Sequence, residues 1–164
     1  MGSHSKIARE LFESGYNCAQ SVFAAFCDVT GLDRGTALRL SSSFGAGMGR
    51  LREVCGAVSA VFMVAGMLYG YTSPEDDGKK AEHYRLLQEF AFRFKEHNGS
   101  YICRELLGLN EYEANPVPEE RTKAYYEARP CAGLVEYAAQ LLDERILENP
   151  DKNCAASGNE KQHA

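Results

Sequence analysis

The sequence predicts an all-α protein, a compact bundle of about five to seven helices around one central buried helix. Three observations favour this class. Apolar residues recur at spacings of three and four along most of the chain. Residues suited to begin or end a helix, such as Asn17 and Gly31, flank these segments. No segment of useful length has the alternation that is typical of a strand.

The elements before the glycine-rich segment are three helices. Residues 5–14 ("SKIARELFES") have helical spacing and stop at Gly15. Residues 17–31 ("NCAQSVFAAFCDVTG") predict one helix, with Asn17 as its N-cap and Gly31 at its C-cap. A short helix from Asp33 toward Ser43 then leads into the glycines.

The central helix is expected to begin near Leu51 or Arg52 and to end at about Tyr69. It contains the longest uncharged run of the chain, which starts at Val54. Because the strongly apolar part of this run is shorter than the roughly 20 residues of a membrane span, we interpret it as a buried helix and expect no membrane span.

The elements after the central helix are also helical. A long amphipathic helix is predicted with Ser73 as its cap, Pro74 in its first turn and Gly99 at its end. A short helix follows in "SYICRELLG", then an acidic loop with one helical turn over residues 109–129, and a last helix in "PCAGLVEYAAQLLDERILE". We expect one helical domain over residues 1–149 and a disordered tail over 150–164.

Charge and composition narrow the function classes. The net charge of −5 argues against nucleic acid or an anionic membrane as a partner, because both favour basic surfaces. The start of the chain has no apolar region typical of a signal peptide, so a cytoplasmic location is expected. Thiols stay reduced in that compartment, and the six cysteines therefore predict catalysis, redox exchange, metal binding or burial rather than a disulfide framework.

The glycine-rich string "GAGMG" is interpreted as a turn that positions a thiol rather than as a nucleotide-binding loop. A dinucleotide site needs a preceding strand, and a phosphate-binding P-loop needs a following Gly-Lys-Ser/Thr, and both are missing. The glycines allow a sharp turn with positive φ that leads into the central helix, with Cys55 about one turn inside it. A helix N-terminus and the nearby Arg50 and Arg52 lower the pKa of a thiol, so Cys55 is the expected low-pKa thiolate.

Four of the six cysteines share a predicted position at the start of a helix. Cys18 follows the cap Asn17, Cys103 lies three residues after Ser100, and Cys131 follows Pro130; Cys55 is the fourth. The two others do not: Cys27 lies near the end of its predicted helix, where we interpret it as core, and Cys154 lies in the tail. If the four helix starts converge, the site suits reversible dithiol chemistry or a metal or iron–sulfur cluster.

The quoted segments resemble a known family. "GYNCAQSV", "FGAGMGRLREVCGAVSAVFMVAG", "CRELLG" and a final cysteine before an apolar helix are similar to the C_GCAxxG_C_C family of small bacterial and archaeal proteins, described as redox-active. The resemblance covers most of the chain and places the family's cysteines on Cys18, Cys55, Cys103 and Cys131. Ala60 stands where the family has a glycine. The resemblance also implies a likeness to the non-haem part of split-Soret cytochromes, which favours an iron–sulfur centre.

The preferred hypothesis is a redox-active protein with one four-cysteine site. Cys18, Cys55, Cys103 and Cys131 would either exchange disulfides, with Cys55 attacking and another cysteine resolving, or ligate an iron–sulfur cluster for electron transfer. Two alternatives stay open: a non-enzymatic protein whose four cysteines bind zinc, and a helical interaction module with buried cysteines. The expected partner is a redox protein that the sequence does not identify, and a homodimer stays open.

Overall fold

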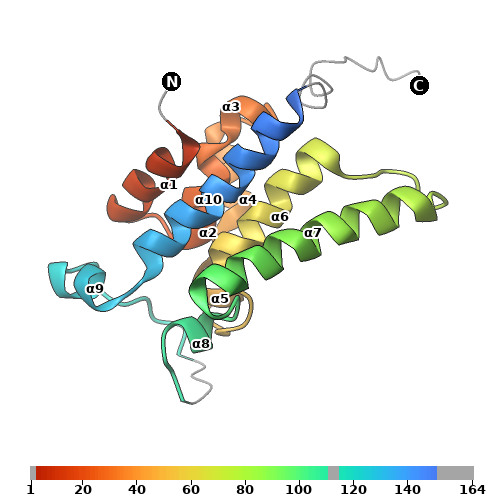
Figure 1. Ribbon diagram of the computed structural model, residues 1–164. Helices are drawn as coiled ribbons and strands as arrows, with labels where there is room; N and C mark the ends of the chain where they lie inside the picture. The colour runs from red at the N-terminus through yellow and green to blue at the C-terminus, as the bar shows by residue number, and fades with distance from the viewer. Residues whose placement is uncertain (1–2, 111–114, 151–164) are drawn as a thin grey trace.

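The computed structural model of the chain describes residues 3–110 and 115–150, and over these ranges it is helical without a strand. Figure 1 shows the helices as one bundle. They are α1 (His4–Glu13), α2 (Cys18–Ala25), α3 (Cys27–Thr30), α4 (Arg34–Ser41), the 3₁₀ turn η1 (Ser42–Phe44), α5 (Gly45–Met48), α6 (Gly56–Tyr69), α7 (Asp77–Asn98), α8 (Cys103–Leu106), α9 (Lys123–Ala128) and α10 (Cys131–Glu148). The all-α class is confirmed, and six of these helices have eight or more residues.

The central helix of the bundle is α6. It packs against α2, α7 and α10, while α1 covers α2 and α10 on the other side. Its small residues let these neighbours approach, and Ala57, Ala60, Val64 and Ala65 are fully buried. Ala60 is therefore a core residue whose methyl group packs between helices.

Two helix boundaries differ from the sequence prediction. The helix expected over residues 17–31 is broken at Phe26, whose fully buried ring lies between α2 and α3. The long helix begins after the N-cap Asp76 rather than at Ser73, because the Asp76 carboxylate accepts a hydrogen bond from the Lys79 N–H. The other end of that helix is where it was expected, at Gly99 in the left-handed conformation.

The glycine-rich segment forms a left-handed turn. The five residues from Ala46 to Arg50 all have positive φ, between 56° and 71°. Glycine adopts this conformation without strain, but each non-glycine residue there costs on the order of 1 kcal/mol or more. The turn therefore stores backbone strain, and the contacts around it must hold it in place.

The start of the central helix was predicted wrongly. Arg52 also has positive φ, at 61°, and Val54 pairs with Ile102 in an isolated antiparallel bridge, so neither residue is helical. Helix α6 begins only at Gly56, and Cys55 is its N-cap rather than a residue one turn inside it.

His4 ties the first helix to the last. Its Nδ1 bonds to Asp143 of α10, its Nε2 lies 3.1 Å from Asp28, and its ring stacks on Phe26. The hydrogen bond to Asp143 is the main cause that raises the pKa of His4, against the effect of burial. The charged form of the histidine is therefore favoured in the folded protein.

This contact predicts a pH-dependent stability. A raised histidine pKa stabilises the fold fully below the unfolded value of about 6.5, and the contribution is lost as the pH rises through the folded pKa. We expect His4→Gln to lower the free energy of unfolding more at pH 5.5 than at pH 9, measured by urea denaturation. His83 is the control, since burial lowers its pKa and His83→Gln should give the opposite trend. An equal loss at both pH values for His4→Gln would contradict the prediction.

None of the helices within residues 3–110 and 115–150 has both the length and the apolar character that a membrane crossing requires.

Candidate functional site

Two of the predicted cysteines are brought together by the isolated bridge. The Cys55 N–H donates to the Tyr101 carbonyl at 2.8 Å, and the Cys103 N–H donates to the Glu53 carbonyl at 2.6 Å. These backbone bonds hold the segment before α6 against the segment before α8. Cys55 and Cys103 thereby lie at the same end of the bundle, next to the left-handed turn.

All four predicted cysteines lie at helix N-termini. Cys18, Cys103 and Cys131 are the first residues of α2, α8 and α10, and Cys55 directly precedes α6. In Figure 1, α6 and α10 both run away from the end of the bundle at which α5 and α8 lie. The capping box at Asn17, whose side chain accepts from the Gln20 N–H, fixes the start of α2 in the same region.

Cys18 lies within electrostatic reach of the three other thiols. A negative charge on Cys18 raises the pKa of Cys55, of Cys103 and of Cys131, and Cys103 acts in the same way on Cys55 and Cys131. The four helix starts therefore share one neighbourhood, with Cys18 as the residue that interacts with every other. All four are free thiols in the structure, and Cys18 and Cys131 are partly exposed whereas Cys55 and Cys103 are buried.

The expectation that Cys55 is a low-pKa thiolate is wrong. Burial is the largest cause and raises the pKa of Cys55 well above its ordinary value, and the charge of Cys18 raises it further. The N–H groups of Ala57 and Val58 at the start of α6 do lower the pKa, as a helix N-terminus should, but their effect is smaller than that of burial. Cys55 is 5% exposed, which also keeps it from attacking a substrate in solvent.

Burial is also the largest cause of the raised pKa of Cys131 and of Cys103. It raises the pKa of Cys131 to about 12, with the charge of Cys18 next, while Arg129 opposes the shift. It raises the pKa of Cys103 as well, against a hydrogen bond from Arg52, whose Nη1 lies 3.9 Å from the sulfur. The arginine that the sequence associated with Cys55 therefore acts on Cys103.

Cys27 stays apart from this site. It begins the short helix α3, so a position at a helix start does not by itself select the site cysteines. Burial raises its pKa, and the charges that act on it are those of Arg34, Asp28 and Asp33 rather than those of the other thiols. Cys154 lies outside the described residues.

Three glycines let the backbone come close to the site. A Cβ on Gly56 would lie 2.5 Å from the Cys18 sulfur, and one on Gly47 would lie 2.6 Å from the Cβ of Cys103. At Gly45 the side chain of Asn17 occupies the place of a Cβ. Gly47 has a positive φ, as predicted, but Gly45 and Gly56 do not, so these two are required for close packing.

Sequence reasoning missed a group of charged residues that the loop over residues 115–129 brings to the cysteines. Arg129 acts electrostatically on Cys103 and Cys131, and Arg121 acts on Cys131. Both guanidinium groups lie over the ring of Tyr125, each 4.7 Å from its centroid. The loop is rich in charged residues, but no local pattern shows which of its side chains fold back onto the site.

The arrangement of the thiols gives no support to a bound metal. Across residues 3–110 and 115–150, no three His, Cys, Asp or Glu side chains form a group that could hold a metal ion. Arginines lie near Cys103 and Cys131, and all four cysteines lie at helix N-termini, which suits an anionic centre. The described sulfurs nevertheless do not form a set of metal ligands. The residues therefore do not fit a zinc ion or an iron–sulfur cluster as they stand.

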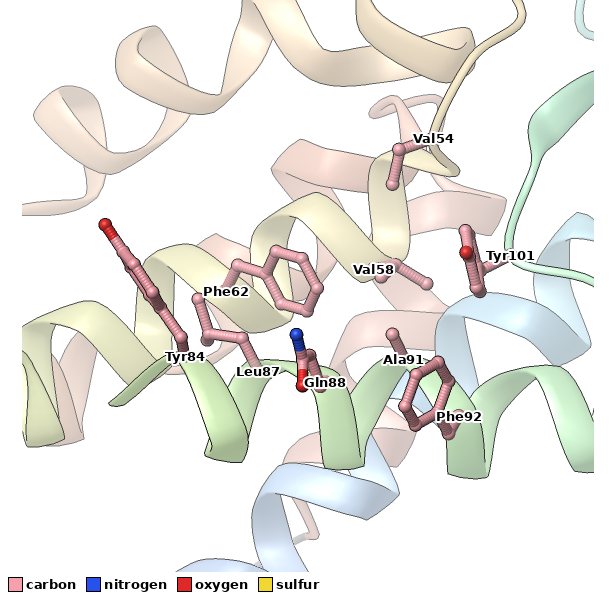
Figure 2. A pocket seen from close by; sticks show the side chains of 9 residues that line it. All are labelled: Val54, Val58, Phe62, Tyr84, Leu87, Gln88, Ala91, Phe92 and Tyr101. Atoms are coloured by element: carbon pink, nitrogen blue, oxygen red, sulfur yellow. The ribbon is translucent and has the colours of Figure 1, made fainter. Parts of the chain in front are cut away.

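An apolar pocket lies beside the bridge that positions Cys55 and Cys103. Its volume is about 410 Å³, and Figure 2 shows side chains of α6, such as Val58 and Phe62, facing side chains of α7 across it. Val54 and Tyr101, the neighbours of the bridge cysteines, line the same pocket. No cysteine is among its described lining residues.

Comparison with known proteins gives one result. A search of curated proteins and a search of solved structures each gave no match. The family model described as "Putative redox-active protein (C_GCAxxG_C_C)" matches residues 16–145, which include all four cysteines of the site and exclude Cys154. The resemblance seen in the sequence is thus confirmed, and the chain belongs to the C_GCAxxG_C_C family.

Proposed function

We propose that this protein carries out thiol–disulfide exchange at one site made of Cys18, Cys55, Cys103 and Cys131. The observation that carries the proposal is the close packing at Gly56, the residue after Cys55, where a Cβ would lie 2.5 Å from the Cys18 sulfur. The charge of Cys18 also acts on each of the other three thiols but is not among the main charges that act on Cys27. Thiols that are neighbours in the folded state can pass a disulfide from one to the next. The redox-active family description supports the same class of function.

Cys18 is the thiol that attacks. It is partly exposed, whereas Cys55 and Cys103 are buried, so a disulfide in solvent can reach its sulfur at the start of α2. Its thiolate attacks one sulfur of a substrate disulfide, and that bond breaks. One half of the substrate leaves as a thiolate and takes a proton from water, while the other half stays bound to Cys18 as a mixed disulfide.

Cys103 is the thiol that resolves this mixed disulfide. The adjacent Arg52 guanidinium stabilises its thiolate against the effect of burial. Its sulfur attacks that of Cys18 and releases the second half of the substrate. In total, two protein thiols become one disulfide with the loss of two electrons and two protons, and the substrate disulfide becomes two thiols.

The test is made on wild-type protein purified under reducing conditions without oxygen. Iron, zinc and sulfide are measured first, and the protein is then treated with one equivalent of a small disulfide and mapped by mass spectrometry. We expect a colourless, metal-free protein that forms one internal disulfide containing Cys18. Iron and sulfide with visible absorbance would overturn the proposal in favour of a cluster protein. Thiols that do not react in the folded state would overturn it in favour of a structural helical protein.

A further inference from the structure

A polar pocket of about 270 Å³ adjoins the cysteines on the side of the left-handed turn. Its described lining includes Arg50, Arg52, Arg121 and Arg129, and Glu119 is the carboxylate among them. We name this the arginine pocket. Asn17, the residue before Cys18 in the chain, also lines it.

The Glu119 carboxylate neutralises only part of the positive charge of the four arginines in the pocket. Its carboxylate pairs closely with Arg129 but lies 3.9 Å from the nearest guanidinium nitrogens of Arg50 and Arg52. One carboxylate is thus shared among several arginines, and the described lining has four arginines for one glutamate, a surplus of three positive charges. The whole chain has a net charge of −5, so this local excess is opposite in sign to the protein as a whole.

Two guanidinium groups each have a buried nitrogen without a hydrogen-bond acceptor among the described residues. Arg52 is 2% exposed, and its Nε has no hydrogen-bond acceptor among the described residues. The buried Nη1 of Arg121 likewise has none in the described part of the chain. A buried N–H without an acceptor is costly, and a guanidinium group binds the two oxygens of a carboxylate especially well. These groups are thus suited to an oxyanion.

The pocket lies close to the Cys103 sulfur, because one arginine contacts both. Arg52 lines the pocket and also places its Nη1 3.9 Å from the Cys103 sulfur. The charge of Arg129, another lining residue, acts on both Cys103 and Cys131. An anion held by these arginines would therefore have the rest of its molecule beside the thiols.

We propose that the arginine pocket binds a carboxylate of a small anionic disulfide, and so selects low-molecular-weight disulfides with carboxylate groups as substrates. The proposal rests on the proposed function, since it names the substrate class for the same thiol site. Glu119 shows that a carboxylate is accommodated among these arginines, and a carboxylate of the substrate binds to those that Glu119 leaves unmatched. The pocket volume suits one short carboxylate arm rather than a large ligand.

The experiment compares three disulfides of similar size on the reduced full-length protein. Dithiodipropionate carries two carboxylates, hydroxyethyl disulfide is neutral and cystamine carries two ammonium groups. We expect the second-order rate of oxidation to be roughly tenfold higher for dithiodipropionate than for hydroxyethyl disulfide, with cystamine the slowest. The negative charge of the whole protein would by itself produce the reverse order.

Two variants with opposite charge changes locate the effect. Arg50→Gln should lower the ratio of the anionic to the neutral rate toward one, and Glu119→Gln should raise it. Because both rates are measured on the same variant, a change in thiol reactivity cancels in the ratio. Equal rates for the anionic and neutral disulfides in the wild type, or a ratio that neither variant moves, would overturn the pocket proposal and leave thiol exchange standing. Reaction with none of the three disulfides would overturn both.

Discussion

Replacing Cys18 with serine should slow the oxidation of the protein by a small disulfide by roughly 100-fold or more, because a serine hydroxyl is not a nucleophile toward disulfides at neutral pH. The three remaining site thiols cannot take over. Cys55 and Cys103 are buried, and burial raises the pKa of Cys131 to about 12, so that little thiolate forms there near neutral pH. The rate is measured by stopped-flow mixing with hydroxyethyl disulfide, and mass spectrometry identifies the product.

Cys27→Ser is the matched control for this variant. Cys27 is also partly exposed and also begins a helix, but the charges that act on it come from Arg34, Asp28 and Asp33. Its replacement should leave the rate within about twofold of the wild type. If Cys18→Ser retains the wild-type rate, Cys18 is not the attacking thiol. If Cys18→Ser and Cys27→Ser slow the oxidation equally, the reaction does not take place at the four-cysteine site.

Replacing Gly56 with alanine should lower the free energy of unfolding by about 2–3 kcal/mol, the upper part of the range of about 1–3 kcal/mol that is usual for overpacking a core. The new methyl group would lie 2.5 Å from the Cys18 sulfur and 2.6 Å from the Phe44 carbonyl oxygen. Helices α2 and α6 must then move apart at the point where the thiols meet. Urea denaturation measures the loss of stability, and the rate at which Cys18 is alkylated reports the local displacement.

Gly66→Ala in the same helix supplies the control. Apart from the adjoining backbone of its own helix, no atom of the described residues lies within 4 Å of the position of its Cβ, and its φ is not positive. Since alanine favours a helix more than glycine does, this variant should raise the free energy of unfolding by about 0.5–1 kcal/mol. The two substitutions are chemically identical and should have opposite signs. A stabilising effect of Gly56→Ala would show that α2 and α6 do not approach as closely as the structure has them.

The left-handed turn explains why the sequence prediction failed at the central helix. The residues from Leu51 to Tyr69 have good helical character, and local reasoning therefore extended the helix back to Arg52. In the fold, Arg52 has positive φ and is 2% exposed, and Val54 pairs with Ile102 across the chain. These long-range contacts outweigh local helix propensity, which is the common way in which such predictions fail.

The prediction that Cys55 has a lowered pKa was wrong for a related reason. A helix N-terminus does favour a thiolate, and the N–H groups of Ala57 and Val58 have that effect here. The sequence contains no measure of how deeply the residue is buried, because burial depends on which helices cover it. At this position the desolvation of the charged form is larger than the stabilisation by the helix, and the sign of the shift is reversed.

The sequence by itself determined the all-α class, the central buried helix, the family and the position of four cysteines at helix starts, because periodicity, caps and motif order are local properties of the chain. Only the tertiary structure decided which thiol is central, that Arg52 acts on Cys103 rather than Cys55, and that Arg121 and Arg129 join the site. These relations depend on segments far apart in the chain, held together by the backbone bonds of residues 53–55 to residues 101–103 and by the close approach at Gly56. Burial and distance set the chemistry of a thiol, and both arise only when the helices pack.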